Sequence, residues 1–168
     1  MNFSRKGLVL AALQVLLVAS LGAKLKWDRA HLPRVWVKAA AVDPALPIRG
    51  RYLAVRLAVQ VPNPPTQVRD RDPFFGAVLS ARSGQLVAEP SPTTTYSSGI
   101  WVTRPARSAD FALQQPVLFF LPEHAADPMV AARNGELWAE VTVPDSGLPR
   151  PIRLAIKRGE TFTPIETK

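Results

Sequence analysis

The stretch YLAVRLAVQV, residues 52–61, decides the fold class because its side chains alternate in character along the whole run. One alternating set is wholly aliphatic: Leu53, Val55, Leu57, Val59 and Val61. The residues between them are small, polar or aromatic. In a β-strand, successive side chains point to opposite faces of the sheet. The pattern therefore predicts a strand with an apolar inner face, ended by the proline-rich segment 62–65.

Shorter apolar stretches on both sides of this strand predict further strands, over residues 35–39, 74–82, 85–89, 100–103, 117–121, 137–143 and 152–157. Ser83-Gly84 is suited to a hairpin turn, and residues 117–121 form a continuous apolar run that we expect to be buried. Residues 123–133 predict a short helix that stops at Asn134-Gly135. Strands without helical crossovers favour antiparallel pairing. We therefore expect a mainly β (α+β) domain, sandwich-like or barrel-like, with one short helix.

The N-terminal segment predicts that the protein is targeted to a membrane. Arg5 and Lys6 precede a run without charge from Gly7 to Ala23, the pattern of a secretory signal or of an uncleaved signal anchor. A spanning helix needs roughly 20 apolar residues, with about 17 as the lower limit, and this run meets that limit. We interpret residues 1–6 as a cytoplasmic region, 7–25 as a transmembrane signal anchor and 26–168 as the β-rich domain. The alternative is a signal that is cleaved near Ser20 or Gly22.

The charges flanking the run leave two orientations open. Arg5 and Lys6 lie on the N-terminal side, whereas the other side carries Lys24, Lys26, Arg29, Arg34 and Lys38. A literal count of cations places the C-terminal side in the cytoplasm. A long domain, however, translocates largely regardless of its charge. We therefore expect a single-pass protein of the inner (cytoplasmic) membrane, with its N-terminus inside and its domain in the periplasm.

Composition excludes several classes of protein. The formal net charge is +8, but the basic residues are scattered, whereas a nucleic-acid-binding protein clusters them on one face. Proximity to anionic lipid is a simpler account of the charge. The chain has no cysteine, which excludes a disulfide framework, thiol catalysis and cysteine-based zinc sites.

Three segments, in this order, resemble one family. Val42-Asp43-Pro44 leads into IRGRYLAVRL at residues 48–57, which is similar to the "PvDPrdllrGDYxxLxY" signature of the GDYXXLXY membrane-anchored proteins. Residues 119–124, FFLPEH, resemble that family's "YYVPEG" segment, and residues 137–159 resemble its closing hairpin. The matching positions are Asp43, Pro44, Gly50, Tyr52, Pro122 and Glu123. Arg51 stands where the family has Asp, so a cationic ligand held by that acid would not be bound here. The resemblance implies an envelope location and association with a polytopic membrane protein, and it implies no chemistry.

No catalytic constellation is evident in the sequence. Asp43-Pro44 and Gly50 suit a turn before a strand, and Glu123 suits a helix start. His124 is the best titratable candidate, but a lone His beside Glu is usually a surface residue. The order of anchor and β domain is shared with membrane signal peptidases, but no Ser lies between Ser20 and Ser80 to act as their nucleophile. We therefore predict no catalytic residue, metal or cofactor, and a non-catalytic domain that binds a membrane partner. The alternatives are a secreted or periplasmic ligand-binding domain and, more remotely, a hydrolase.

Overall fold

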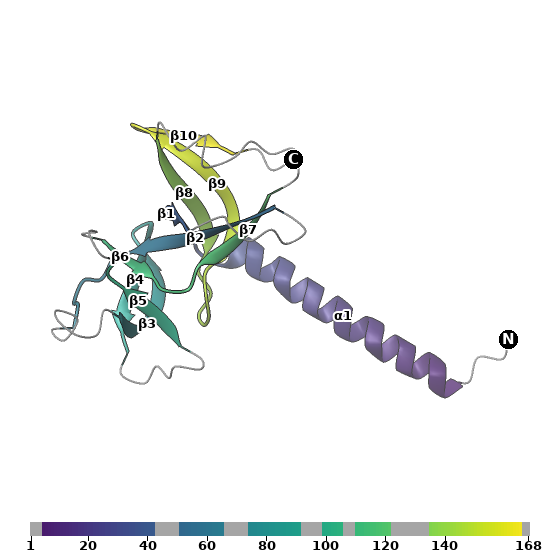
Figure 1. Ribbon diagram of the computed structural model, residues 1–168. Coiled ribbons are helices and arrows are strands. Elements are labelled where there is room, and N and C mark those ends of the chain that lie inside the picture. Colours follow the sequence, from purple (N-terminus) through teal and green to yellow (C-terminus); the bar gives the residue numbers. More distant parts are fainter. Residues whose placement is uncertain are drawn as a thin grey trace. The chain divides into compact units, whose positions relative to one another are not determined.

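The computed structural model divides the chain into two compact units, Met1–Leu32 and Pro33–Lys168. It describes residues 5–42, 51–65, 74–91, 99–105, 110–121 and 135–165. The first unit is the helix α1 (Arg5–His31), and the strands of the second join into one 10-stranded sheet (Figure 1). The strands are β1 (Arg34–Ala41), β2 (Arg51–Val59), β3 (Phe74–Arg82), β4 (Gln85–Pro90), β5 (Ile100–Thr103), β6 (Phe111–Leu113), β7 (Val117–Leu121), β8 (Glu136–Thr142), β9 (Arg150–Arg158) and β10 (Thr161–Pro164). The predicted β-rich domain behind an N-terminal helix is confirmed.

Helix α1 is long and apolar enough to cross a membrane over Lys6–Asp28. Its large apolar side chains from Leu8 to Leu25 are at least half exposed. The helix continues beyond the predicted apolar span to His31, because no Gly or Pro follows Gly22 until Pro33. The residue before a proline is disfavoured in the helical region, which accounts for the end of α1 at this point.

Half of the domain is an antiparallel meander in the order β10-β9-β8-β1 (Figure 1). The first residues of β1 pair with the last of β8, from Arg34↔Thr142 to Lys38↔Trp138. The turn between β9 and β10 uses Gly159 at φ +58°, a conformation that favours glycine. Two consecutive hairpins therefore carry the C-terminal part of the chain.

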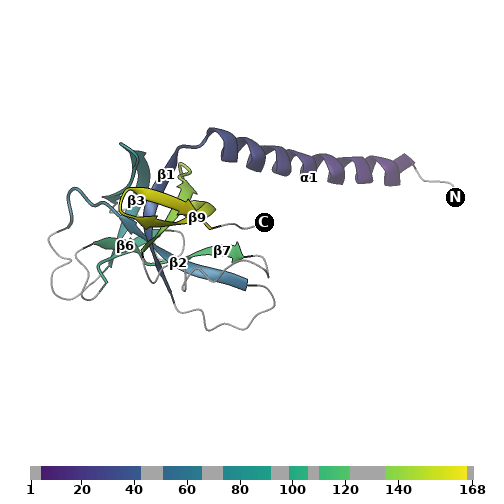
Figure 2. The ribbon, with the colours of Figure 1, turned by 90° about the horizontal axis from the view of Figure 1, so that it is seen from above.

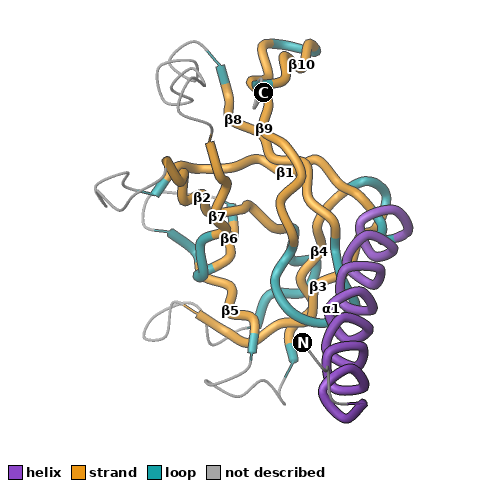
Figure 3. The backbone as a smooth tube through the Cα atoms, turned by 90° about the vertical axis from the view of Figure 1, so that its right-hand side faces the viewer, coloured by secondary structure: helices purple, strands orange, loops and turns teal. Residues whose placement is uncertain are grey.

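Strand β2 joins this meander to a small ring of strands (Figure 3). Its first half pairs with β7, its middle with β1, and Ala58 and Val59 pair with β6. Beyond it, Gln60 makes a parallel bridge to Val87 of β4, with Gln60 N–H donating to Leu86 C=O at 2.9 Å and Ala88 N–H donating to Gln60 C=O at 2.8 Å. Strands β2, β6, β5, β3 and β4 thereby close on themselves, which gives the barrel-like part of the prediction.

The aliphatic face of β2 lies at the centre of the core, as its alternation predicts. Leu53, Val55, Leu57 and Val59 are all buried, and Val55 and Leu57 are fully inaccessible. They belong to one cluster that includes residues from every strand except β10. One continuous apolar core therefore supports both the meander and the ring.

The structure adds two strands to those predicted, β6 and β10. Phe111–Leu113 is too short to show a period, and Thr161–Pro164 is exposed at every position. β6 forms between β2 and β5, and β10 forms along the outer edge of β9. The predicted helix over residues 123–133 lies outside the described residues.

Candidate functional site

Of the family-motif positions, only Tyr52 lies among the described residues; Asp43, Pro44, Gly50, Pro122 and Glu123 do not, and neither does His124. Tyr52 lies on β2 near its first residue, and Arg51 pairs directly with Leu121 of β7. The chain therefore continues into residues 43–50 and 122–134, which contain the other motif positions, from two residues that are directly paired. The two segments are attached to the same end of the β2–β7 ladder.

An exposed apolar surface lies beside this end, and we call Tyr52, Leu118 and Phe120 the β2–β7 patch (Figure 2 shows the two strands). The exposed fractions of these residues are 53%, 57% and 61%. Tyr52 pairs directly with Phe120, and their rings make an edge contact with centroids 5.5 Å apart. Large apolar side chains grouped at such exposure on adjacent strands indicate an interaction surface.

The patch arises because β7 is apolar on both faces. Val117, Phe119 and Leu121 point into the core, whereas Leu118 and Phe120 point outward. The prediction that residues 117–121 form a fully buried run was therefore wrong. The reason is that β7 is covered on one face only. Among the described residues, β7 forms a ladder with β2 alone.

A second candidate site opens where β1 and β2 separate. Their pairing stops at Ala39↔Leu57, after which β2 turns to β6 and β4. Two adjoining cavities of about 200 and 170 Å³ lie in this fork. Both are lined by Lys38, Ala58 and Asp110. The first cavity exists because the short side chains of its lining, at Ala40, Ala58 and Ala112, do not fill this space.

Besides Lys38, the first cavity is lined by the cation Arg56. Arg56 lies on the outer face of β2 opposite Ala40, and its Nε is buried without a hydrogen-bond partner among the described residues. A buried donor without a partner destabilises the folded state by about 1–3 kcal/mol. A ligand oxygen that accepts a hydrogen bond from Arg56 would remove this cost.

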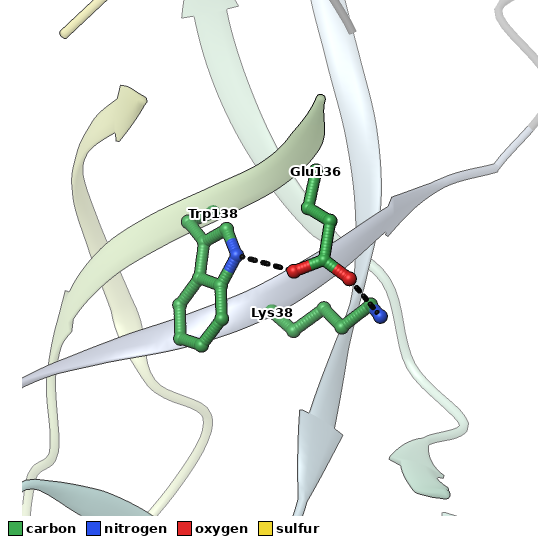
Figure 4. A network of polar contacts seen from close by, with 3 residues as sticks. All are labelled: Lys38, Glu136 and Trp138. Atoms are coloured by element: carbon green, nitrogen blue, oxygen red, sulfur yellow. Dashed lines mark hydrogen bonds and ion pairs between the residues drawn. The ribbon is translucent and has the colours of Figure 1, made fainter. Parts of the chain in front are cut away.

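Lys38 is held at the wall of the fork by a short polar network (Figure 4). Its amine donates to Glu136 Oε1 at 2.6 Å, and the Trp138 indole N–H donates to Glu136 Oε2 at 3.2 Å. The hydrogen bond from Lys38, and then that from Trp138, lowers the pKa of Glu136 below its ordinary value. The carboxylate is therefore charged at neutral pH and fixes the position of Lys38.

Cations and aromatic rings cover the outer face of the meander. Phe162 contacts both Trp36 and Trp138, with centroids 5.2 and 5.6 Å apart, and the Lys157 amine lies 4.9 Å from the Trp138 ring centroid. Trp36 is half-buried on this face. The sequence signal for this outer face is the alternation of residues 34–40, in which the even-numbered positions lie opposite the buried odd-numbered ones.

Two further observations concern titratable residues. Among the described residues, no group of three or more His, Cys, Asp or Glu side chains is arranged to hold a metal ion. His31, near the end of α1, stacks on Trp27 with ring centroids 3.9 Å apart, and its Nδ1 lies 3.0 Å from the Trp27 C=O. His31 thus packs on the last turn of α1.

Compared with models of known protein families, with curated proteins and with solved structures, the chain gives no significant match. The resemblance to the GDYXXLXY proteins stays a prediction.

Proposed function

We propose that this chain is a single-pass envelope protein of the inner membrane whose β domain binds a polytopic membrane protein and catalyses no reaction. The observation that carries the proposal is the pairing of a helix of spanning length, exposed on all sides, with a compact β domain that begins two residues after it. An apolar helix whose side chains are exposed requires an apolar environment.

The continuity of α1 supports a retained anchor. Ser20 and Gly22, the two candidate cleavage positions, lie inside one unbroken helix that runs to His31. Cleavage after Gly22 would leave Ala23–His31 as a helical remnant. Isolated helices below about 12–15 residues are marginal in water, so the structure favours an intact helix held in lipid.

The β2–β7 patch is the surface we assign to the partner. An extended segment of a partner protein can add to the edge of β7 opposite β2, where backbone hydrogen bonds supply affinity. Leu118 and Phe120 would give such a segment apolar contacts at alternate positions. Tethering by α1 raises the effective concentration of the domain beside any protein in the same membrane, so a modest patch suffices for association.

The orientation in this proposal follows from the length of the domain. More than 130 residues follow Pro33, and long domains translocate largely regardless of charge. We place the N-terminus in the cytoplasm and the domain in the periplasm.

Affinity purification after cross-linking in intact cells tests the proposal. The native chain should recover a polytopic membrane protein, and Phe120→Asp should reduce that recovery at least tenfold, because a carboxylate in the patch would be desolvated on docking. Val78→Asp is the matched control: Val78 is a singly exposed apolar residue on β3, 53% accessible, and the change should leave recovery unaltered.

Two results would count against the proposal. Equal recovery by Phe120→Asp and Val78→Asp would remove the patch as the docking surface. If no membrane protein were recovered, and residues 33–168 alone restored the wild-type phenotype to a deletion strain, the tethered partner-binding function would be wrong.

The fork cavities favour a second candidate, a domain that binds a small organic anion through Arg56. Such a ligand should raise the melting temperature of the native chain, and Arg56→Met should abolish the shift. Arg82→Met, which removes an exposed ion-pair partner of Glu89 on another hairpin, should not. A library of carboxylates and phosphates that stabilises neither variant nor the native chain would eliminate this candidate.

A further inference from the structure

We infer that the turn between β8 and β9, residues 143–149, faces the bilayer and that the two arginines beside it bind anionic phospholipid headgroups. The inference rests on the proposed membrane anchor and adds to it a defined lipid-facing end of the β domain.

The first step is the covalent connection between the membrane segment and the domain. Only Leu32 and Pro33 lie between the end of α1 and the start of β1. Roughly 20 residues from Gly7 fill the apolar layer and reach Lys26. Trp27 to His31 then rise about 7 Å, comparable with the about 5–7 Å of headgroup region on each side of a bilayer. The domain therefore begins at the headgroups, with Trp27, an interfacial residue type, at their inner boundary.

The second step places the turn at the same end of the domain. Val143 N–H donates to Pro33 C=O at 3.0 Å, so the first residue of the domain is hydrogen-bonded to the first residue of the turn. Pro144 and Pro149 are buried and hold the base of the turn, whereas Asp145–Leu148 are exposed. The base of the turn therefore lies beside Pro33, the residue at which the domain begins.

The third step is chemical complementarity to an anionic lipid surface. Arg34 and Arg150 are both directly paired with Thr142, one on each side, so their side chains leave the same face of the sheet. Both are exposed, as is Leu148, whose exposed fraction is 37%. A cation beside an anionic membrane gains about 1 kcal/mol. Asp145 is the carboxylate of the turn tip and offsets part of the gain.

A shallow apolar contact completes the surface. Leu148 lies between Gly147, at φ +87°, and the buried Pro149. These two residues define the shape of the turn, and the leucine side chain itself is not part of the core. A leucine placed outward beside two arginines can enter the boundary between headgroups and acyl chains while the cations remain at the phosphates.

The absence of cysteine makes a direct test possible, because single cysteines can be labelled without background. The full-length chain carrying Leu148→Cys or Glu160→Cys is labelled with a polarity-sensitive fluorophore and reconstituted in nanodiscs. Glu160 is the matched control because it lies in the turn at the opposite end of β9, whose nine residues span about 30 Å. Quenching by a lipid spin-labelled at the headgroup then measures proximity to the bilayer.

The inference predicts several-fold stronger quenching at position 148 than at position 160. Replacing part of the phosphatidylcholine by phosphatidylglycerol should increase quenching at 148. Arg34→Gln with Arg150→Gln should abolish that increase, and Arg34→Lys with Arg150→Lys should preserve it, which separates loss of charge from loss of fold. Equal quenching at the two positions, or no response to phosphatidylglycerol, would overturn the inference.

Three further outcomes separate this inference from the proposals above. Elution of the protein away from the nanodiscs would refute the anchor itself. Co-elution without quenching at 148 would refute only the lipid-facing turn. If position 148 became protected only when a co-extracted membrane protein was present, the turn would bind protein rather than lipid, and the inference would be wrong.

Discussion

The ion pair between Glu140 of β8 and Arg153 of β9 should contribute to stability asymmetrically. Arg153 Nε lies 2.6 Å from Glu140 Oε2, but the side chain of Glu140 is only 9% exposed whereas that of Arg153 is 51% exposed. Removing Arg153 leaves a nearly buried carboxylate without its cation. Removing the charge of Glu140 instead leaves a guanidinium that water can solvate.

The magnitudes follow from these exposures. Breaking a buried pair by deleting one partner costs about 3–5 kcal/mol, and a half-exposed partner reduces this by roughly half. We therefore expect Arg153→Met to destabilise the domain by about 2 kcal/mol. Methionine retains an apolar stem, so the contact with the Trp36 ring, whose centroid lies 5.3 Å from the guanidinium, is partly preserved. Glu140→Gln keeps an oxygen acceptor for Arg153 and should cost less than about 1 kcal/mol.

Urea unfolding of the full-length chain in a mild detergent, followed by tryptophan fluorescence, measures both values. With a denaturant slope of about 2 kcal/mol per molar urea, Arg153→Met should lower the midpoint by about 1 M. The shift for Glu140→Gln should be less than half of that, and the double variant should be less destabilised than the sum of the two single changes. A larger loss from Glu140→Gln than from Arg153→Met would refute the reasoning, because it would show that the carboxylate does not depend on its cation.

Three further predictions concern the core, a close approach and pH. Leu57→Ala, at the fully buried centre of β2, should cost about 2–5 kcal/mol in urea unfolding, since both the meander and the ring lose packing there. Gly135→Ala should cost about 1–3 kcal/mol by the same measurement, because its Cβ would lie 2.8 Å from the Lys157 C=O, whereas Gly22→Ala meets nothing within 4 Å and should leave the domain unaffected. The pKa of Glu136 is lowered in the folded state, so the contribution of this carboxylate to stability should be complete above its ordinary pKa of 4.5 and lost as the pH falls through the folded value. Lys38→Met removes the main cause of the lowered pKa, so its melting temperature should depend less on acid than that of the native chain. The difference should correspond to at most about 1 kcal/mol in free energy of unfolding.

The local features of the fold could be predicted from the sequence wherever short-range periodicity or turn chemistry specifies them. Of the predicted aliphatic set, Leu53, Val55, Leu57 and Val59 lie on β2 and are buried, whereas Val61 follows the strand and is half-buried. The hairpin at Ser83-Gly84 has positive φ at both residues, 50° and 74°, as a tight turn between twisted strands needs. Strands β3, β5 and β7 have their predicted limits. In each case the information lies within about ten residues of chain.

Features that depend on distant pairing could not be predicted in this way. The division of β2 among β7, β1, β6 and β4, and with it the fork cavities, depends on where four separate partners begin and end. The exposure of Leu118 and Phe120 depends on β7 being covered on one face, which an apolar run does not indicate. The contact of Lys38 with Glu136 joins residues 98 positions apart in the chain.

The central claim, a retained anchor with the domain outside the cytoplasm, is tested most directly by thiol labelling in cells. A Glu160→Cys variant is exposed to a membrane-impermeant maleimide after outer-membrane permeabilisation, and the labelled protein is isolated from carbonate-washed membranes for intact-mass measurement. We predict a labelled, full-length chain in the membrane fraction, while an Asn2→Cys variant stays unlabelled until the inner membrane is opened. A soluble product that begins near Leu21 or Ala23, or labelling of position 2 but not of position 160 in unbroken inner membranes, would contradict the account.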